Sequence, residues 1–283
     1  MESGEFELRV AFQGELGAYS ESAVYSFFGQ SAEVKPCKSF DDVFESVKTE
    51  DVNYGVVPIE NSIEGSVNRT YDLFLEYDLK VCGEIIIRIS HCLIAHKGTN
   101  IDQIKTVYSH PQALAQCRKF LEQHKLRAIS TFDTAGSVKM IKEEKLMDAA
   151  AIASERAAQI YDMTILEKEI EDNKNNSTRF FVLDKKDSQY SGQDKTSIIF
   201  AAKSVPGALY QILKEFADRN INLTKIESRP TKSTPWEYHF YLDFEGHRTE
   251  TKCQQALNSI RDKTIFVKIL GSYKAANKAN FKL

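Results

Sequence analysis

A threonine and an arginine stand at the beginning of one apolar run, in the segment "NNSTRFF" of residues 175–181. The run that follows predicts a β-strand. An arginine beside Phe180 and Phe181 is costly if it is buried without a partner, whereas a guanidinium group can hold a carboxylate through two parallel hydrogen bonds. The hydroxyl of Thr178 is too weak an acid to protonate a leaving group, but it can donate a hydrogen bond. On these residues alone, the simpler interpretation is that Arg179 is a solvated residue at the strand end.

Four further polar segments each follow an apolar run that predicts a strand. They are "GELGAYSE" (14–21), "PIENSIEGS" (58–66), "SHPQALAQC" (109–117) and "DTAGS" (133–137). Ligands of open α/β sheets bind beyond the carboxyl ends of the strands, and the first N–H groups of a helix can hold a carboxylate. Any one of these segments is also explained as a plain helix cap. Together they predict one ligand-binding cleft.

The elements that position these residues alternate along the first part of the chain. Strand and helix patterns alternate from Leu8 through the helix "SVNRTYDLFLEY", an order that predicts a parallel sheet covered by helices. The run "KVCGEIIIRISHCLIAHKG" (80–98) then predicts one long extended crossover to a second α/β lobe. In that lobe we expect a single helix in "PQALAQCRKFLEQH" (111–124). The late strand "RFFVLDK" is expected to return to the first lobe and close the cleft.

The polar segment "DKKDSQYSGQDK" (184–195) has the composition of a linker. The patterns beyond it predict strand, helix, strand, strand, helix and strand. This βαββαβ order is that of a ferredoxin-like domain. The fold class we expect is therefore α/β, with a two-lobed first domain and a ferredoxin-like second domain.

Composition narrows the possible functions. A chain of 283 residues with 42% apolar and 27% charged residues is an ordinary globular composition, and its net charge of −3 favours neither nucleic acid nor anionic membranes as partners. No apolar run is long enough to span a bilayer. The opening "MESGEFELRV" lacks the pattern of an export signal. We expect a cytoplasmic protein without a membrane partner.

The cysteines and histidines do not suggest a metal site. The five cysteines are scattered and lack a C-x-x-C spacing, so we expect reduced thiols and no zinc. His91 and His96 are expected to face opposite sides of an extended run. Nothing resembles a phosphate-binding loop, a dinucleotide fingerprint or a nucleophile elbow. We therefore expect neither a metal nor an organic cofactor.

The motifs "PIENSIEG", "SHPQALAQC", "DTAGS", "AAIAS" and "NNSTRFFVL" occur in an order and spacing that resembles the prephenate dehydratases. The C-terminal part resembles the ACT regulatory domain of that family, with "GALY" and "ESRP" matching its two phenylalanine-binding motifs. The resemblance extends from about residue 8 to residue 275. Ala18 stands where microbial prephenate dehydratases often have threonine; alanine there is also common in arogenate dehydratases, which leaves arogenate open as an alternative substrate.

The resemblance implies a two-lobed fold like that of periplasmic binding proteins and the conversion of prephenate to phenylpyruvate in phenylalanine biosynthesis. It implies a catalytic domain in residues 1–184, with lobes at about 5–78 plus 165–184 and 79–164, and an ACT domain in 195–283. It places Thr178 at the catalytic centre, with Glu60 and Asn61 in support. The implied substrate-binding residues are Arg179, Phe180, Ser62, Ser109, Gln112, Gln116, Thr134, Ala135 and Gly136.

The same resemblance implies that L-phenylalanine binds the ACT domain as an effector. ACT domains usually pair side by side with the ligand at their interface, so a homodimer or homotetramer is expected. The implied effector-binding residues are Gly207, Ala208, Leu209, Tyr210, Asn222, Leu223, Glu227, Ser228, Arg229 and Pro230. Of these, Arg229 is expected to order its loop through Glu227 or a partner subunit rather than to touch phenylalanine.

Three other classes of protein compete with an enzyme. A two-lobed α/β unit also occurs in solute-binding proteins, but those carry an export signal. A ligand-sensing transcription factor needs a basic DNA-binding face, which the sequence does not indicate. An ACT protein that senses phenylalanine without catalysis differs from the enzyme in one measurable respect, since it turns over neither prephenate nor arogenate.

Overall fold

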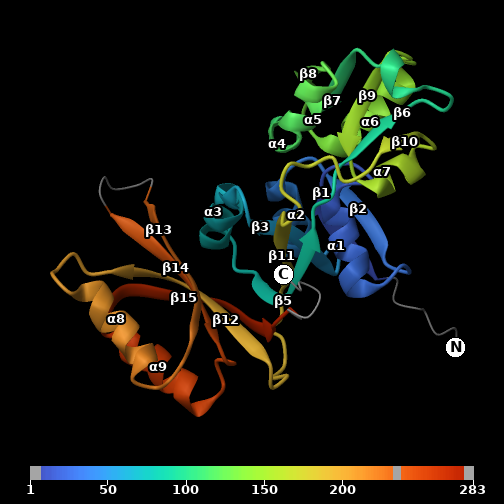
Figure 1. Cartoon of the computed structure of the whole chain (residues 1–283). Coiled ribbons are helices and arrows are strands. Elements are labelled where there is room, and N and C mark those ends of the chain that lie inside the picture. The colour runs from blue at the N-terminus through green and yellow to red at the C-terminus, as the bar shows by residue number, and fades with distance from the viewer. Residues whose placement is uncertain (1–7, 232–236, 277–283) are drawn as a thin grey trace, which may run out of the picture. The chain divides into compact units, whose positions relative to one another are not determined.

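The computed structural model describes residues 8–231 and 237–276. The chain divides into two compact units (Figure 1). The N-terminal unit comprises the described residues up to Leu75 together with Ile85–Phe180. The C-terminal unit comprises Glu76–Glu84 and the described residues from Phe181 onward. None of the helices in the described ranges is long and apolar enough to cross a membrane.

The first sheet of the N-terminal part has the strand order β2-β1-β3-β11-β5. Its strands are β1 (Arg9–Gln13), β2 (Glu33–Cys37), β3 (Tyr54–Asn61), β5 (Lys80–Arg88) and β11 (Ser177–Asp184), with the short β4 (Gly65–Ser66) beside β3. Strand β1 is parallel to both β2 and β3. Its residues Val10, Ala11 and Phe12 are all fully buried, because helices cover a parallel sheet on both faces. The expected return of the late strand to this sheet is confirmed.

The helices of this lobe are α1 (Tyr19–Phe28), α2 (Phe40–Lys48) and α3 (Asn68–Glu76). Helix α2 begins with the capping box that its sequence predicts, since the Ser39 side chain accepts from the Asp42 N–H and the Asp42 carboxylate accepts from the Ser39 N–H. Helix α1 ends at Gly29, as predicted. Along the chain, α1 follows β1 and α2 follows β2, each after a short loop.

The second lobe contains a sheet with the order β10-β6-β9-β7-β8. Its strands are β6 (Cys92–Ala95), β7 (Thr106–Ser109), β8 (Arg127–Ser130), β9 (Ala149–Ala153) and β10 (Thr164–Glu167). The helices are α4 (Pro111–Gln116), α5 (Arg118–Gln123), α6 (Thr134–Glu143) and α7 (Glu155–Ile160), with a 3₁₀ turn η1 (Ile101–Gln103). Alternate residues of β9 enter two separate apolar clusters, so helices pack on both faces of this sheet (Figure 1).

Two details of the sequence prediction were wrong. The run 80–98 crosses between the lobes, but it is not one strand. Strand β5 lies in the first sheet and β6 in the second, and residues 89–91 between them belong to neither strand. The single helix expected at 111–124 is two helices divided at Cys117. There, the carbonyl of Gln116 accepts a hydrogen bond from the Asp172 N–H at 2.7 Å. A distant segment thus takes an acceptor that a continuous helix would use.

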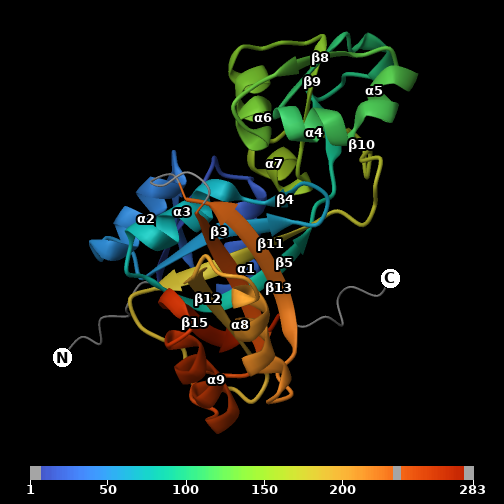
Figure 2. The same ribbon diagram turned by 90° about the vertical axis from the view of Figure 1, so that its left-hand side faces the viewer.

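The C-terminal unit has the predicted βαββαβ order (Figure 2). It consists of β12 (Asp194–Ala202), α8 (Ala208–Ala217), β13 (Leu223–Pro230), β14 (Tyr238–Glu245), α9 (Thr251–Arg261) and β15 (Thr264–Lys274). The sheet is antiparallel, in the order β13-β14-β12-β15. Helices α8 and α9 bury their apolar stripes against it in one cluster, as a ferredoxin-like domain requires.

The C-terminal unit also includes the first half of β5 and the second half of β11. The ring of Phe181 lies 5.4 Å from that of Tyr273, centroid to centroid. A buried ion pair joins Lys195 Nζ to Glu84 Oε1 at 2.7 Å. The halves of β5 and β11 that belong to this unit pack against its other residues. A chain that ended after β11 would therefore expose their apolar side chains.

Candidate active site

A cavity of about 670 Å³ lies in the N-terminal unit, and both lobes contribute to its wall. Residues of each of the four polar segments line it, as does the strand β11. Among the residues singled out from the sequence, the wall contains Asn61, Gln112, Gln116, Thr134 and Thr178. The structure thus brings together segments that the sequence places far apart, because each follows a strand whose end faces the same space.

Thr178 is nearly buried, and its hydroxyl oxygen accepts a hydrogen bond from Asn61 Nδ2 at 2.9 Å. The orientation of the Asn61 carboxamide is fixed from the other side, where its Oδ1 accepts the backbone N–H groups of Ile63 at 2.9 Å and Glu64 at 3.0 Å. Asn61 is therefore the donor in the contact with Thr178. The hydroxyl hydrogen of Thr178 is left to be donated to a ligand oxygen in the cavity.

The loop between β1 and α1 is held by the second lobe. The carbonyl of Gly17 accepts from Ser154 Oγ at 2.6 Å, and its N–H donates to Glu21 Oε2 at 2.7 Å. The buried Glu21 carboxylate also binds Arg156, whose Nε lies 2.8 Å away. A Cβ atom on Gly17 would lie 2.7 Å from Ala157 Cα, so only glycine fits this approach. These contacts place Ala18 and Tyr19 in the cavity wall.

Three of the ionisable residues that line the cavity are Arg69, Lys38 and Asp133. Arg69 pairs with Asp41 through two hydrogen bonds. Lys38 is exposed, and no ion pair or side-chain hydrogen bond links it to any residue within 8–231 or 237–276. Burial raises the pKa of Asp133, whose carboxylate caps α6 by accepting the Gly136 N–H. The cavity can thus offer Lys38 to an anionic ligand.

The remaining residues singled out from the sequence lie outside the wall. Ser62 Oγ donates to the Asn175 carbonyl at 3.1 Å and accepts the Ser177 N–H at 2.9 Å, so it fixes the loop before Thr178. Ser109 is fully buried and donates to the Ile152 carbonyl. Ala135 and Phe180 are core residues, Gly136 binds its helix cap, and Glu60 pairs with Ser66 across β3 and β4.

Arg179 follows Thr178 directly on β11, and consecutive strand residues point to opposite faces. Thr178 lines the cavity and Arg179 does not. The role expected for Arg179 as a carboxylate clamp therefore stays a prediction.

The residues singled out from the sequence did not include four that build the site, Tyr19, Lys38, His91 and Asn176, although Tyr19 lies in the segment 14–21 and Asn176 in the segment 175–181. Lys38 follows β2 directly and precedes α2, so the strand-end rule that found the other segments would also have found it. His91 lines the cavity although it was considered only as a metal ligand. Burial lowers the pKa of His91, against smaller upward effects of Gln116 and Glu171. Its ring is therefore neutral near pH 7.

No group of three or more histidine, cysteine or acidic side chains in the described part of the chain could hold a metal ion. Besides the carboxylates of Asp41, Glu64 and Asp133, the cavity wall offers hydroxyl, carboxamide, imidazole and ammonium donors. Such groups bind and orient an oxygen-rich anion through hydrogen bonds.

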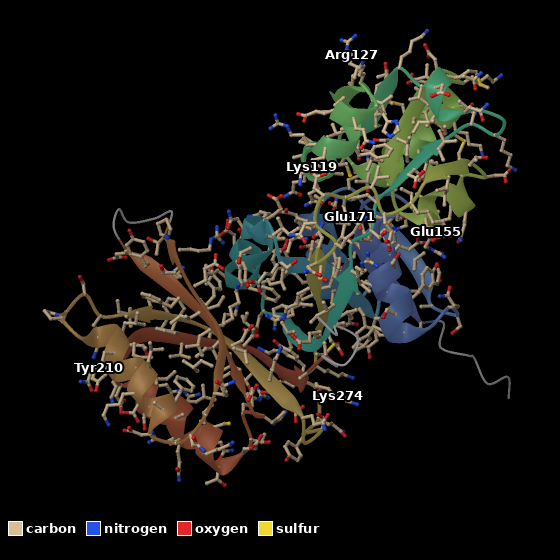
Figure 3. The ribbon with its side chains drawn as sticks, in the orientation of Figure 1. Lys119, Arg127, Glu155, Glu171, Tyr210 and Lys274 are labelled. Atoms are coloured by element: carbon tan, nitrogen blue, oxygen red, sulfur yellow. The ribbon has the colours of Figure 1, made fainter. Side chains whose placement is uncertain are left out.

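The segments "GALY" and "ESRP" lie in the C-terminal unit. Gly207 has φ 78° and begins α8, and Tyr210 on that helix is exposed (Figure 3). Strand β13 is an edge strand without one fully buried residue. On it, Lys225 Nζ lies 3.1 Å from Glu227 Oε2, and the Arg229 guanidinium lies 5.9 Å from the ring centre of Tyr241. The remaining expected residues, Ala208, Leu209, Asn222, Leu223, Ser228 and Pro230, lie on or beside these two elements.

Comparison with known proteins gives consistent results. The family model described as prephenate dehydratase matches residues 10–188, and that of the ACT domain matches residues 196–262. The chain is 46% identical to a bifunctional chorismate mutase/prephenate dehydratase of Aquifex aeolicus, over 96% of this chain and 75% of the relative. It is 46% identical to a prephenate dehydratase of Methanocaldococcus jannaschii, over 91% of this chain and 94% of that one.

A solved structure supports the same relationship. A prephenate dehydratase of Arthrobacter aurescens in complex with L-Phe has a TM-score of 0.87 and 31% identity, and the match covers 95% of this chain and 90% of that one. The two-lobed fold resembling periplasmic binding proteins, followed by a ferredoxin-like domain, is therefore as expected. On the family models, the relatives and this structure, the chain belongs to the prephenate dehydratase family and carries a C-terminal ACT domain.

Proposed function

We propose that the cavity binds prephenate and converts it to phenylpyruvate, water and carbon dioxide. The observation that carries this proposal is the Thr178 hydroxyl, which accepts from Asn61 Nδ2 at 2.9 Å and so keeps its own hydrogen for a substrate oxygen. Prephenate offers such an oxygen in the ring hydroxyl that leaves as water. The family assignment supports the same reaction.

The reaction breaks two bonds. The ring C–O bond breaks as the hydroxyl group leaves and takes up a proton to become water. The ring C–C bond to the carboxylate breaks as carbon dioxide leaves, and its electron pair completes the aromatic ring. We assign Thr178 the role of hydrogen-bond donor to the departing hydroxyl. Asn61 orients that donor. Glu60, the residue before Asn61 on β3, assists it in the same role.

The substrate also has a carboxylate on its pyruvyl side chain, which needs a cation. Lys38 is the cation of the wall without a partner among the described residues. A cation on the other, departing carboxylate would stabilise the ground state more than the transition state, which opposes catalysis. We therefore assign Lys38 to the side-chain carboxylate, with Gln112 and Thr134 as neutral donors. The alternative cation is Arg179, as expected from the resemblance.

A rate comparison on two substrates tests this function. The wild-type chain is incubated with prephenate or with arogenate, and the product is measured by ultraviolet absorbance after its separation. Phenylpyruvate formed from prephenate at a higher kcat/KM than the reaction of arogenate supports the proposal. A large preference for arogenate would make arogenate the substrate and the protein an arogenate dehydratase. No turnover of either compound would favour the non-catalytic phenylalanine sensor.

We further propose that L-phenylalanine is the effector and binds the ACT domain. The related structure that matches 95% of this chain was solved with L-Phe. The open edge strand β13 and the turn at Gly207 are compatible with side-by-side pairing of two such domains, with the ligand between them. The homodimer or homotetramer that this pairing implies is tested by mass measurement in solution with and without phenylalanine.

A further inference from the structure

His91 is held on three sides at the break between β5 and β6. Its Nε2 lies 3.0 Å from Gln116 Oε1, and its Nδ1 lies 3.1 Å from the Tyr19 hydroxyl. Its backbone N–H donates to Glu171 Oε2 at 2.9 Å, a buried carboxylate labelled in Figure 3. Only 2% of the residue is exposed, although its ring lines the cavity. Such a ring has one orientation, set by its neighbours.

The direction of the hydrogen bonds that reach this ring is fixed from the backbone. Because Asn61 Oδ1 accepts two backbone N–H groups, its Nδ2 must be the donor to Asn176 Oδ1, at 2.7 Å. The nitrogen of Asn176 is then the donor to Gln116 Oε1, at 2.8 Å. Gln116 therefore turns its oxygen toward Asn176 and His91. An acceptor in that place requires a hydrogen on His91 Nε2.

The same orientation decides what Gln116 presents to the cavity. Its Nε2 is 3.5 Å from Glu64 Oε1, at the outer limit of a hydrogen bond. This amide nitrogen is therefore able to donate to an anionic ligand. If the carboxamide were turned over, its oxygen would face the ligand, and repulsion would weaken binding of a dianion.

We propose that His91, in the tautomer with hydrogen on Nε2, is a positioning residue that holds the Gln116 carboxamide with its nitrogen toward the substrate. This inference rests on the proposed function, since it assumes that the cavity binds prephenate. Tyr19 contributes from the other side of the ring. Its hydroxyl donates to the Ser90 carbonyl at 2.6 Å, and the hydroxyl oxygen lies 3.1 Å from His91 Nδ1.

Three substitutions of His91 separate this role from simple packing. His91→Phe keeps a ring without a donor, His91→Asn reaches the Nδ1 position, and His91→Gln reaches the Nε2 position with an N–H group. We expect kcat/KM for prephenate to fall about tenfold in His91→Phe and His91→Asn, since a buried acceptor loses one of its two donors. His91→Gln should remain within about threefold of the wild type.

A double-mutant cycle supplies the second measurement. Gln116→Ala should lower kcat/KM in the wild type but have little further effect in His91→Phe or His91→Asn, because the two residues act as one unit. Additive losses, or equal losses in His91→Gln and His91→Phe, would overturn the inference. His96→Phe is the matched control, since His96 Nε2 lies 2.9 Å from the Ile141 carbonyl and its ring is not in the wall. Absence of wild-type turnover would instead count against the proposed function.

Discussion

Asn61 Nδ2 lies 2.9 Å from the hydroxyl oxygen of Thr178, a residue 117 positions further along the chain. The contact joins the end of β3 to the beginning of β11, neighbours in the first sheet. The hydroxyl oxygen of Thr178 therefore accepts a hydrogen bond from the protein, and its hydroxyl hydrogen can be donated to a ligand in the cavity. A weak acid placed in this way can stabilise charge on a departing oxygen without giving up its proton entirely.

Substitution of Thr178 tests that role. Thr178→Val removes the hydroxyl and keeps the shape, so we expect kcat for prephenate to fall about 100-fold with a much smaller change in KM. Thr178→Ser keeps the hydroxyl and should retain most of the activity. Steady-state kinetics on purified, folded variants measures both. Equal activities of the serine and valine variants would rule out the donor role.

Binding of the pyruvyl carboxylate by Lys38 and binding by Arg179 predict opposite results for substitutions of these two residues. If Lys38 binds the pyruvyl carboxylate, Lys38→Met should raise KM about tenfold or more, as the loss of a charge-assisted hydrogen bond does. Arg179→Lys, outside the wall, should then change KM less. Lys35→Met is the control, because Lys35 already pairs with Asp51 and does not line the cavity. A KM that rises in Arg179→Lys and not in Lys38→Met would restore the arginine clamp.

Glu215 on α8 should make the stability of the C-terminal unit depend on pH in the acid range. Its hydrogen bonds to Lys263 and Arg219 lower its pKa from 4.5 to about 2. A carboxyl group with a lowered pKa in the folded state stabilises the fold above its unfolded pKa, and this contribution is lost as the pH falls from 4.5 toward 2.

We therefore expect the wild type to lose more melting temperature than Glu215→Gln between pH 5 and about pH 3. Thermal unfolding followed by circular dichroism at several pH values gives the comparison. The difference between the two proteins should be constant from pH 6 to 8, which serves as the internal control. Parallel curves through the acid range would contradict the assignment.

Gly271 on β15 lies against the first half of β5. A Cβ atom placed on it would come 2.1 Å from the Val81 carbonyl oxygen, too close for any contact between these atoms. Gly271→Ala must push the two strands apart, and we expect a loss of about 1–3 kcal/mol of unfolding free energy. Urea unfolding measures it. An unchanged unfolding free energy would mean that the strands separate without cost and that the close packing of β5 against β15 does not stabilise the fold.

The parts of the site that follow local rules could be predicted, and those set by distant contacts could not. Ser39 and Gly29 mark helix ends through their own backbone and side-chain chemistry, and the polar segments converge because strand ends do. The break at Cys117 depends on Asp172, 55 positions away by the residue numbers, and no local pattern records it. The alternation of a strand would have separated Thr178 from Arg179, a signal present in the sequence.

The orientation of His91 is set by distant contacts and could not be predicted from the sequence. Its tautomer depends on Gln116, Asn176 and Asn61, which come from three separate segments of the chain. Only when the elements are in place does the backbone at Ile63 determine which nitrogen of the ring carries hydrogen. Periodicity and composition carry no information about such a chain of donors and acceptors, so the sequence suggested no role for His91 once a metal site had been set aside.

Phenylalanine binding should depend on Asn222, which precedes β13 and is exposed. An amino acid needs partners for its ammonium group, its carboxylate and its ring. The Asn222 side chain can bind the first, and backbone N–H groups near Ala208 and Leu209 can bind the second. Asn222→Ala should weaken phenylalanine binding about tenfold, as the loss of a hydrogen bond to a charged group does. Calorimetry measures the affinity, and Asn258→Ala on α9, the opposite helix, is the control.

The same calorimetry tests whether phenylalanine and substrate are coupled. If the effector changes the affinity of the cavity, an unreactive prephenate analogue must change the affinity for phenylalanine by the same factor. The whole chain is needed for this measurement, because β5 and β11 are shared by the two units and a chain ending near residue 191 would expose Phe181 and Val81. In Asn222→Ala the factor should persist at weaker affinity, since the substitution affects binding and not coupling. An analogue that saturates the cavity and leaves phenylalanine affinity unchanged would show that the ACT domain does not regulate this site.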